Sequence, residues 1–407
     1  MTSVIDKEMT LLLDTVEKAE NKYSTKLTPK TIKIIKIVEK FISDNELICY
    51  GGIAINNILP KKAHFYSGSE FPDYDFFSPN ALMHAKKLAN IYAKKGYVNV
   101  EAKSGVHYGT YKIFVNFLNI ADITEIEPEY YTNLKKKAIK KDKILYSPPD
   151  FLRMSMYLEL SRPKGDTSRW EKILTRLKLL NKYYPLHSDK CMKDTEPLQS
   201  DIYESVKKQL LSEKVIFFGG FADTLYSKYS KKKHNISKHM TMDVLSKDAK
   251  KVSNSLKKNI SDVSIKHIEN IGHRIPEHYS ITINNKVYAN IYQSEACYTY
   301  NKINIQNKTY NIATIFTMLS LYLIFIFTDR EYYDTNRIMC TANMLQKLYE
   351  KHHLQKKGIL RVYTIDCIGT QETLEDLLLL KRKAYKGIKR QDSNYEKWFL
   401  RYSPKNK

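Results

Sequence analysis

The chain has 407 residues, which is enough for two domains of ordinary size. With 67 Lys and Arg residues against 44 Asp and Glu residues, its formal net charge of +23 predicts a polyanionic partner. The 31 tyrosines favour nucleic acid over an anionic membrane surface, because their rings can stack on bases; a solvated lysine-rich surface without a partner is the alternative.

Cysteine usage and hydropathy bear on the compartment. Five cysteines lie far apart in no metal-ligand spacing, so we expect free or buried thiols in a reducing compartment at Cys49, Cys191, Cys297, Cys340 and Cys367. Residues 1–30 lack a long apolar core, so no secretion signal is expected. The apolar stretch Ile312–Phe327 is shorter than about 20 residues and contains Thr and Ser, which predicts a buried core helix and not a membrane span.

In chain order, the first predicted elements surround a glycine turn. Thr28-Pro29 predicts the start of a helix, since proline suits the first helical turn. The strand Leu47–Tyr50 then leads into Gly51-Gly52 and a short helix. A glycine turn between a strand and a helix lets backbone N–H groups approach phosphates closely. Gly51 and Gly52 are therefore candidate nucleotide-binding residues, with a purely structural corner as the alternative.

The next predicted strand, residues 73–77, begins with two aspartates. Asp73 and Asp75 occupy positions i and i+2, so on a strand they point to the same side. Two carboxylates in one place repel each other unless a divalent cation lies between them, which predicts Mg²⁺ or Mn²⁺. After a glycine turn, the pair predicts metal-dependent nucleotide transfer, whereas an isolated Asp-x-Asp is more often a solvated loop.

A helix over 80–95 and strands between residues 97 and 126 complete a small mixed sheet. Nucleotidyl transfer also requires a third carboxylate on an adjacent strand. We assign this role to Asp122, because it follows the apolar strand Tyr111–Leu118. Glu125 and Glu127 are the other candidates, and Asp122 could instead cap the end of its strand.

The second half of the chain repeats the first. Gly219-Gly220 matches Gly51-Gly52, and 24 residues separate Gly219 from Asp243, as they separate Gly51 from Asp75. This repetition indicates that one ancestral unit has been duplicated.

The two copies differ at the carboxylates. Thr241 stands where the first copy has Asp73. Aligning Asn116 with Asn290 places Ala296 opposite Asp122. The second copy is therefore predicted to be degenerate, with an architectural role.

Several motifs carry a resemblance to a known family: Tyr50–Gly52, Pro72–Ser78, Asn119–Thr124, Ser147–Arg153 and Ser168–Lys172. With them, the chain resembles DNA polymerase β-type nucleotidyltransferases, and more narrowly the poly(A) polymerase catalytic subunits of large nucleocytoplasmic DNA viruses. Many superfamily members have Gly-Ser at Gly51-Gly52, so a serine contact to phosphate is absent here. The resemblance implies an α+β fold of two tandem nucleotidyltransferase-like domains. Residues 1–190 would be catalytic, and residues 191–407 degenerate with a basic C-terminal tail.

The resemblance implies template-independent addition of AMP from ATP to RNA 3′ ends. Asp73, Asp75 and Asp122 would hold two Mg²⁺ or Mn²⁺ ions. It also implies a homodimer, no membrane, and a place in the virion and host cytoplasm. Two alternatives stay open, namely another terminal nucleotidyltransferase (uridylyl or oligoadenylate) and a non-catalytic RNA-binding scaffold. Three nearby cations are left outside the catalytic set because such residues are more often structural: Arg153, Arg169 and Lys172.

Overall fold

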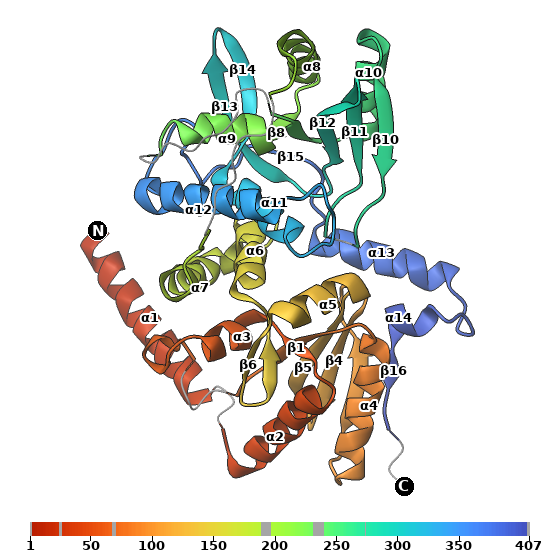
Figure 1. Ribbon diagram of the computed structural model, residues 1–407. Coiled ribbons are helices and arrows are strands. Elements are labelled where there is room, and N and C mark those ends of the chain that lie inside the picture. The colour runs from red at the N-terminus through yellow and green to blue at the C-terminus, as the bar shows by residue number, and fades with distance from the viewer. Residues whose placement is uncertain are drawn as a thin grey trace. The chain divides into compact units, whose positions relative to one another are not determined.

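The computed structural model describes residues 2–23, 27–66, 71–188, 197–230, 240–272 and 274–404. The chain forms two compact units (Figure 1). The first unit consists of Met1–Glu125, Ile139–Tyr146 and Ile388–Lys407, and the second of Ile126–Ala138 and Ser147–Gly387. The predicted boundary at residue 190 lies outside the described residues and stays a prediction.

The first unit is built on a mixed eight-stranded sheet. The strand order is β16 (Arg401–Tyr402), β3 (Val100–Ser104), β4 (Thr110–Val115), β5 (Leu118–Glu125), β2 (Tyr74–Ser78), β1 (Ile48–Cys49), β7 (Ile144–Tyr146) and β6 (Ile139–Lys141). Its helices are α1 (Thr2–Tyr23), α2 (Pro29–Asp44), α3 (Gly51–Ile58), η1 (Lys61–Ala63), α4 (Ala81–Lys94) and α14 (Tyr395–Phe399). Thr28 caps α2 in a capping box with Pro29 in the first turn, as the sequence predicts.

The second unit contains another eight-stranded sheet. The strand order is β10 (Ser264–Ile268), β11 (His278–Ile283), β12 (Lys286–Gln293), β9 (Met242–Ser246), β8 (Ile216–Phe218), β14 (Lys308–Ala313), β13 (Tyr298–Ile305) and β15 (Cys367–Ile368). Its helices are α5 (Pro128–Lys137), α6 (Pro149–Leu160), η2 (Thr167–Arg169), α7 (Trp170–Tyr183), α8 (Ser200–Ser212), α9 (Gly219–Ser227), α10 (Ala249–Asn259), α11 (Ile315–Phe325), α12 (Thr335–His352) and α13 (Leu374–Gly387).

The two sheets share one topology, which confirms the duplication. The order β3-β4-β5-β2-β1-β7-β6 matches β10-β11-β12-β9-β8-β14-β13 strand by strand, and β16 and β15 are added at the edges. Even the irregularities coincide, because the register shifts between Ile113 and Phe114 in one sheet and between Ile281 and Thr282 in the other. This is the same 168-residue offset that relates Gly51 to Gly219. The predicted α+β fold with two mixed sheets is confirmed.

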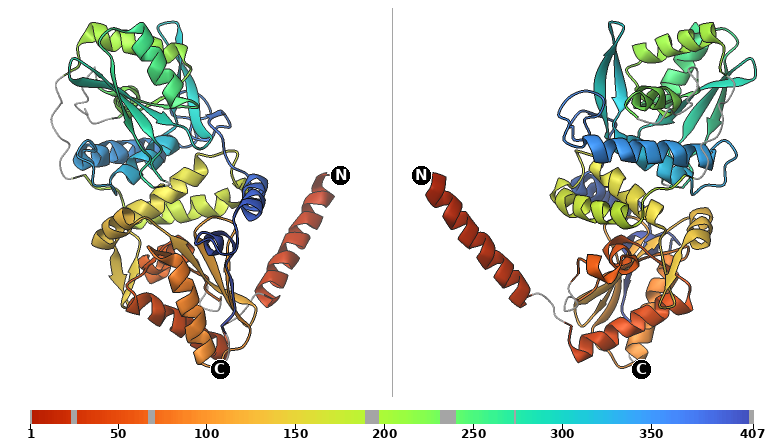
Figure 2. Two further views of the ribbon diagram at one scale, coloured as in Figure 1. Left: turned by 90° about the vertical axis from the view of Figure 1, so that its right-hand side faces the viewer. Right: turned by 60° about the vertical axis from the view of Figure 1, so that its left-hand side comes forward.

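Helices of the second unit form one apolar layer. Every residue of α11 is buried, which confirms that the apolar stretch around Ile312–Phe327 is a core helix. α11 packs against α6 and α12, and α6 packs against α7 (Figure 2). Among the described residues, no helix is long and apolar enough to cross a membrane.

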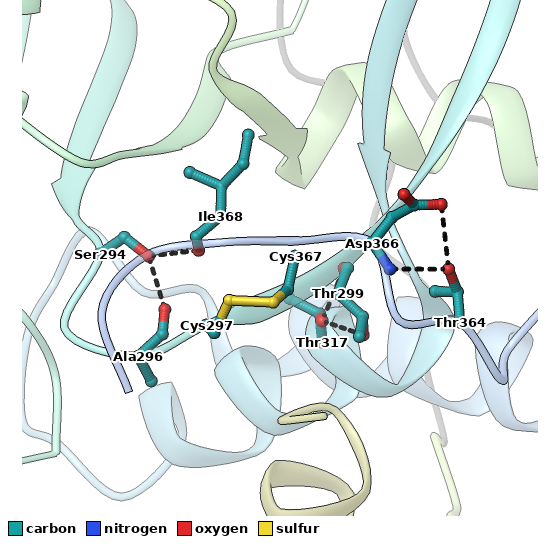
Figure 3. Close-up of a disulfide and its surroundings, with 9 residues drawn as sticks. All are labelled: Ser294, Ala296, Cys297, Thr299, Thr317, Thr364, Asp366, Cys367 and Ile368. Atoms are coloured by element: carbon teal, nitrogen blue, oxygen red, sulfur yellow. Dashed lines mark hydrogen bonds between the residues drawn. A yellow bond between two sulfur atoms is a disulfide. The ribbon is translucent and has the colours of Figure 1, made fainter. Parts of the chain in front are cut away.

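The cysteine prediction is wrong for part of the chain. Cys297, just before β13, and Cys367 of β15 form a disulfide across 70 residues of sequence (Figure 3). Nearby, the Ser294 hydroxyl donates hydrogen bonds to the carbonyls of Ala296 and Ile368. Strand β15 is therefore attached to the segment before β13 by both the disulfide and a hydrogen bond. Cys340 is also disulfide-bonded, Cys49 is a buried free thiol, and Cys191 lies outside the described residues. Sequence spacing did not reveal the pairing because the two strands meet only in the folded sheet.

Arg153 is structural in this fold. Its side chain is 0% exposed within the helical layer. The guanidinium donates to the carbonyl of Tyr184 and, at 3.2 Å, to Oε1 of Gln346, and lies 3.6 Å from Asp150. A buried guanidinium held in this way fixes the packing of α6 against its neighbours and is not available to a substrate.

Replacing this arginine should unfold the protein more easily. We expect Arg153→Ala to lower the free energy of unfolding by about 3 kcal/mol, because buried partners lose their hydrogen bonds. The control is Arg169→Ala, whose side chain is 57% exposed and 3.7 Å from Glu159. That change should cost less than about 1 kcal/mol in urea denaturation. Equal losses in the two variants would contradict the structural role of Arg153.

Candidate active site

The glycine turn lies directly against the first strand carboxylate. Gly51 begins α3 with a φ of +71°, and a Cβ atom at this position would collide with the carboxylate of Asp75. The backbone N–H of Tyr50 donates to the carbonyl of Asp75 at 2.9 Å. Gly52 follows in the first turn of α3 and is buried. Glycine is thus required at residue 51 both by the backbone conformation and by the close approach.

The three predicted carboxylates gather at this corner. Asp75 and Asp122 are directly paired in the parallel register of β2 and β5. Nδ2 of Asn119 donates to Asp122 at 3.0 Å and approaches both carboxylate oxygens of Asp73 at 3.3 and 3.4 Å. One amide therefore joins Asp73 to Asp122, with Asp75 on the neighbouring strand.

The charge of this cluster is only partly compensated. Burial and, second, the nearby Asp122 carboxylate raise the pKa of Asp73 to about 6 against the opposing effect of Lys112. Nζ of Lys112 contacts Oδ2 of Asp122 across the β4–β5 pair. Neighbouring carboxylates of this kind attract any cation that reaches them.

The donor atoms suit a hard divalent cation. Besides the carboxylates, the buried Oδ1 of Asn119 has no hydrogen-bond partner among the described residues. Oxygen ligands of this kind are those that Mg²⁺ and Mn²⁺ prefer. Across the described residues, no group of three or more His, Cys, Asp or Glu side chains is already arranged around a common metal position. The residues have the oxygen ligands and the proximity that a divalent cation requires. In this structure the Lys112 ammonium balances part of their negative charge.

The second repeat keeps the turn and changes the cluster. Gly219 has a φ of +66°, and a Cβ there would collide with Asp243, as at Gly51 and Asp75. Asp243 is paired in register with Asn290, whose Nδ2 donates to it at 2.8 Å. Thr241 occupies the position of Asp73, as predicted.

The predicted match of Ala296 to Asp122 is wrong. Asn290 faces Asp243 as Asp122 faces Asp75, so the equivalent residue is Asn290. The error came from aligning Asn116 with Asn290. Asn116 has a φ of +50° in the β4–β5 hairpin turn, and its true counterpart is Asn284, with the same φ in the β11–β12 turn. The second repeat still lacks the third carboxylate, because Asn290 stands where the first repeat has Asp122.

Two polar neighbours of the cluster were missed by sequence reasoning. Lys112 was treated as part of an apolar strand, and Asn119 only as part of a motif. The signal available for Lys112 was the alternation of β4, in which it lies between the buried Tyr111 and Ile113. The strand of Asn119 and Asp122 does not alternate and gives no such signal. Contact across a hairpin depends on register, which the sequence alone did not specify.

The mixed sheets, with the carboxylate cluster at the glycine turn, form a nucleotidyltransferase fold. Comparison with known proteins narrows the class of protein. Across 98% of this chain and 85% of the other, the structure matches the crystal structure of the Megavirus polyadenylate synthase, with a TM-score of 0.82 and 22% sequence identity. Residues 36–166 match the family model described as poly(A) polymerase catalytic subunit. This segment contains the whole carboxylate cluster and matches that family, so the predicted resemblance is confirmed.

Curated relatives are viral. A putative poly(A) polymerase catalytic subunit of Acanthamoeba polyphaga mimivirus is 34% identical over 214 residues, which is 50% of this chain and 36% of the relative. One of African swine fever virus (strain Badajoz 1971 Vero-adapted) is 33% identical over 195 residues, 46% of this chain and 39% of the relative. The match thus spans less than half the length of these relatives.

The close approach of the Asp75 carboxylate to Gly51 can be tested by comparison with Gly96, which has open space around it. Gly51→Ala and Gly96→Ala both place a side chain at positive φ, but nothing lies within 4 Å of a Cβ at Gly96. We expect about 1–2 kcal/mol of destabilisation for Gly96→Ala. Gly51→Ala should cost at least about 1 kcal/mol more, because the Asp75 carboxylate must move. Urea denaturation measures both, and equal costs would contradict the close approach.

The raised pKa of Asp73 predicts a pH-dependent stability. Its pKa of about 6 in the folded chain exceeds the ordinary value of 3.8, so the ionised carboxylate destabilises the fold above pH 6 and has no such effect well below pH 4. Asp73→Asn should therefore raise the free energy of unfolding at pH 8, by no more than about 1 kcal/mol because the side chain is partly exposed. The gain should vanish at pH 3.5.

The control for this prediction is Asp142→Asn, in an exposed turn of the same unit. It should show no comparable gain at pH 8. A loss of stability for Asp73→Asn at pH 8 would mean that the carboxylate is not destabilised in this cluster.

Proposed function

We propose that this chain adds AMP from ATP to RNA 3′ ends without a template. The observation that carries the proposal is the carboxylate cluster at the glycine turn, within the segment that matches poly(A) polymerase catalytic subunits. In the reaction, the RNA 3′-oxygen bonds to the α-phosphorus of ATP. The bond between the α-phosphorus and the bridging oxygen breaks, and pyrophosphate leaves.

In this proposal, Asp73, Asp75 and Asp122 would hold two Mg²⁺ or Mn²⁺ ions. When bound, such ions polarise the triphosphate and favour ionisation of the attacking hydroxyl. Asn119 positions two of the carboxylates by bonding both, and Lys112 holds Asp122 on the side of β4.

The glycines have a different task. Gly51 and Gly52 offer main-chain N–H groups at the start of α3, and neither has a side chain that would block a phosphate. The Asp75 carboxylate lies against Gly51 and so keeps the turn next to the place where the nucleotidyl group would be transferred. The turn and the carboxylates therefore serve one substrate from two sides.

The partner of this reaction is RNA. The formal net charge of +23 favours binding to its phosphates. The proposal includes self-association as a homodimer, as well as action in the virion and host cytoplasm. Because the second repeat has Thr241 and Asn290 in place of carboxylates, we assign transfer to the first repeat alone.

The decisive experiment compares equivalent aspartates in the two repeats. Purified protein is incubated with labelled RNA, Mg²⁺ or Mn²⁺, and each nucleoside triphosphate separately. We expect extension with ATP, a loss of at least about a hundredfold in Asp75→Asn, and a change within about threefold in Asp243→Asn. Circular dichroism checks that both variants fold.

The outcomes separate the alternatives. Extension with UTP in preference to ATP would indicate a uridylyltransferase, and short unprimed products from ATP would indicate oligoadenylate synthesis. RNA binding without extension under every condition would indicate a non-catalytic scaffold. Equal damage by Asp75→Asn and Asp243→Asn would overturn the assignment of one active and one degenerate repeat.

A further inference from the structure

The degenerate repeat has a cavity at its glycine turn. A cavity of about 610 Å³ is lined by Gly219, Asp243 and Asn290, which are the counterparts of Gly51, Asp75 and Asp122. This volume lies in the range of small-molecule sites. A repeat retained only for packing has no need of such a cavity, so we asked what its lining would bind.

Aromatic side chains form part of the wall. Tyr332 is 53% exposed and packs edge-on against Tyr333, with ring centroids 4.5 Å apart. The buried His278 stacks on Tyr292 at 4.3 Å with an angle of 21° between the rings, and its own centroid lies 6.1 Å from that of Tyr332. Burial lowers the pKa of His278 to about 4, so this imidazole is neutral at neutral pH. Rings of this kind offer stacking surfaces for a planar base.

Arg337 and Lys266 line the cavity and form no ion pair among the described residues, although the charge of Arg337 opposes the rise in pKa of the neighbouring Asp223 and Asp243. Among the contacts of the described residues, the Arg337 guanidinium makes one side-chain hydrogen bond, to the sulfur of Met240 at 3.5 Å, and no ion pair. Nη2 of Arg337 would lie 3.5 Å from a Cβ at Gly220, so the guanidinium stands beside the glycine turn. By contrast, Arg330 is paired with Glu129 at 2.9 and 3.0 Å. Arg337 is thus the arginine of this wall that is placed to receive a phosphate.

The floor of the cavity no longer suits a divalent cation. Asp243 accepts a hydrogen bond from Asn290, and Thr241 donates its hydroxyl to the carbonyl of Val287. Burial, opposed by the Asn290 amide and by Arg337, raises the pKa of Asp243 to about 6. Each carboxylate of the lining is held within the protein: Asp243 by Asn290, Asp223 by the hydroxyl of Tyr322 at 2.8 Å, and Asp334 by the backbone N–H groups of Asn336 and Arg337. With these carboxylates engaged and an arginine beside the turn, the lining favours an anionic ligand without a metal.

We propose that this cavity binds a nucleoside phosphate, with the base against the Tyr332 wall and the phosphate at Arg337, without metal and without reaction. The nucleotide is either free or one unit of an RNA strand, since both present the same chemistry. The site is separate from the proposed catalytic corner, and its occupancy does not depend on nucleotide transfer.

The test uses the full chain with Asp73→Asn and Asp75→Asn, in EDTA, so that metal-dependent binding at the first repeat is removed. AMP, adenosine and inorganic phosphate are titrated by calorimetry, and labelled oligoadenylate by fluorescence anisotropy. We expect saturable binding of AMP or of oligoadenylate, with adenosine and phosphate at least about tenfold weaker than AMP wherever AMP binds.

Two pairs of variants locate the site. Arg337→Gln should weaken binding about tenfold or more, whereas Lys257→Gln, an exposed change of equal charge on α10, should leave it unchanged. Tyr332→Ala should weaken binding about fivefold to a hundredfold, and Tyr332→Phe should retain it because the ring remains. Thermal unfolding checks that each variant is folded. If Arg337→Gln does not fold, the comparison of Tyr332→Ala with Tyr332→Phe tests the site.

Each outcome is decisive. Binding of AMP that Arg337→Gln abolishes supports a free nucleotide as the ligand. Binding of oligoadenylate alone, with the same sensitivity, supports a nucleotide of RNA. Absence of both, or binding that neither Arg337→Gln nor Tyr332→Ala changes, overturns the proposal, and it does so without bearing on extension of RNA by the wild-type chain.

Discussion

Both repeats depend on a main-chain turn that leaves no room for a side chain. Gly51 and Gly219 each stand at positive φ, and an aspartate carboxylate occupies the space that a Cβ atom would need. This contact fixes the distance between the start of a helix and the neighbouring strand, and so fixes where a helix N-terminus meets a carboxylate. The strands around it follow one order in both sheets. The chemistry of each repeat is then set by the few side chains that surround the turn.

The parts predicted from sequence were those encoded locally. The glycine–aspartate spacing, the alternating strands and the capped helix at Thr28 each rest on neighbouring residues, and the structure contains all of them. The equivalence of Asp122 in the second copy failed because it was drawn from one matching asparagine. The hairpin turns, with their residues at positive φ, carry the true alignment and lead to Asn290. Backbone conformation at a turn was thus a better marker of equivalence than residue identity.

What the sequence did not show is contact between distant segments. Lys112 meets Asp122 only because β4 and β5 pair in a particular register. The disulfide of Cys297 and Cys367 requires β13 and β15 to be neighbours, and β16 joins β3 from the far end of the chain. Each of these depends on tertiary pairing across tens to hundreds of residues, for which a single sequence offers no local signal. They also alter the chemistry, since Lys112 partly neutralises the cluster that the aspartates create.

The duplicated corner shows how a few substitutions reverse the charge that a site prefers. In the first repeat, Asp73 and Asp122 surround Asp75, and Lys112 of β4 opposes them. In the second, the registers place Ser280 where Lys112 lies and Asn290 where Asp122 lies. Together with Thr241 in place of Asp73, two changes leave one carboxylate of three and a third removes the lysine, while Arg337 lies beside the turn. Because the backbone is the same, the two proposed functions differ only in side chains: the first corner would bind cations and through them a triphosphate, and the second would bind a phosphate directly. Duplication preserved the position of the glycine turn, and the side chains around it set the local charge.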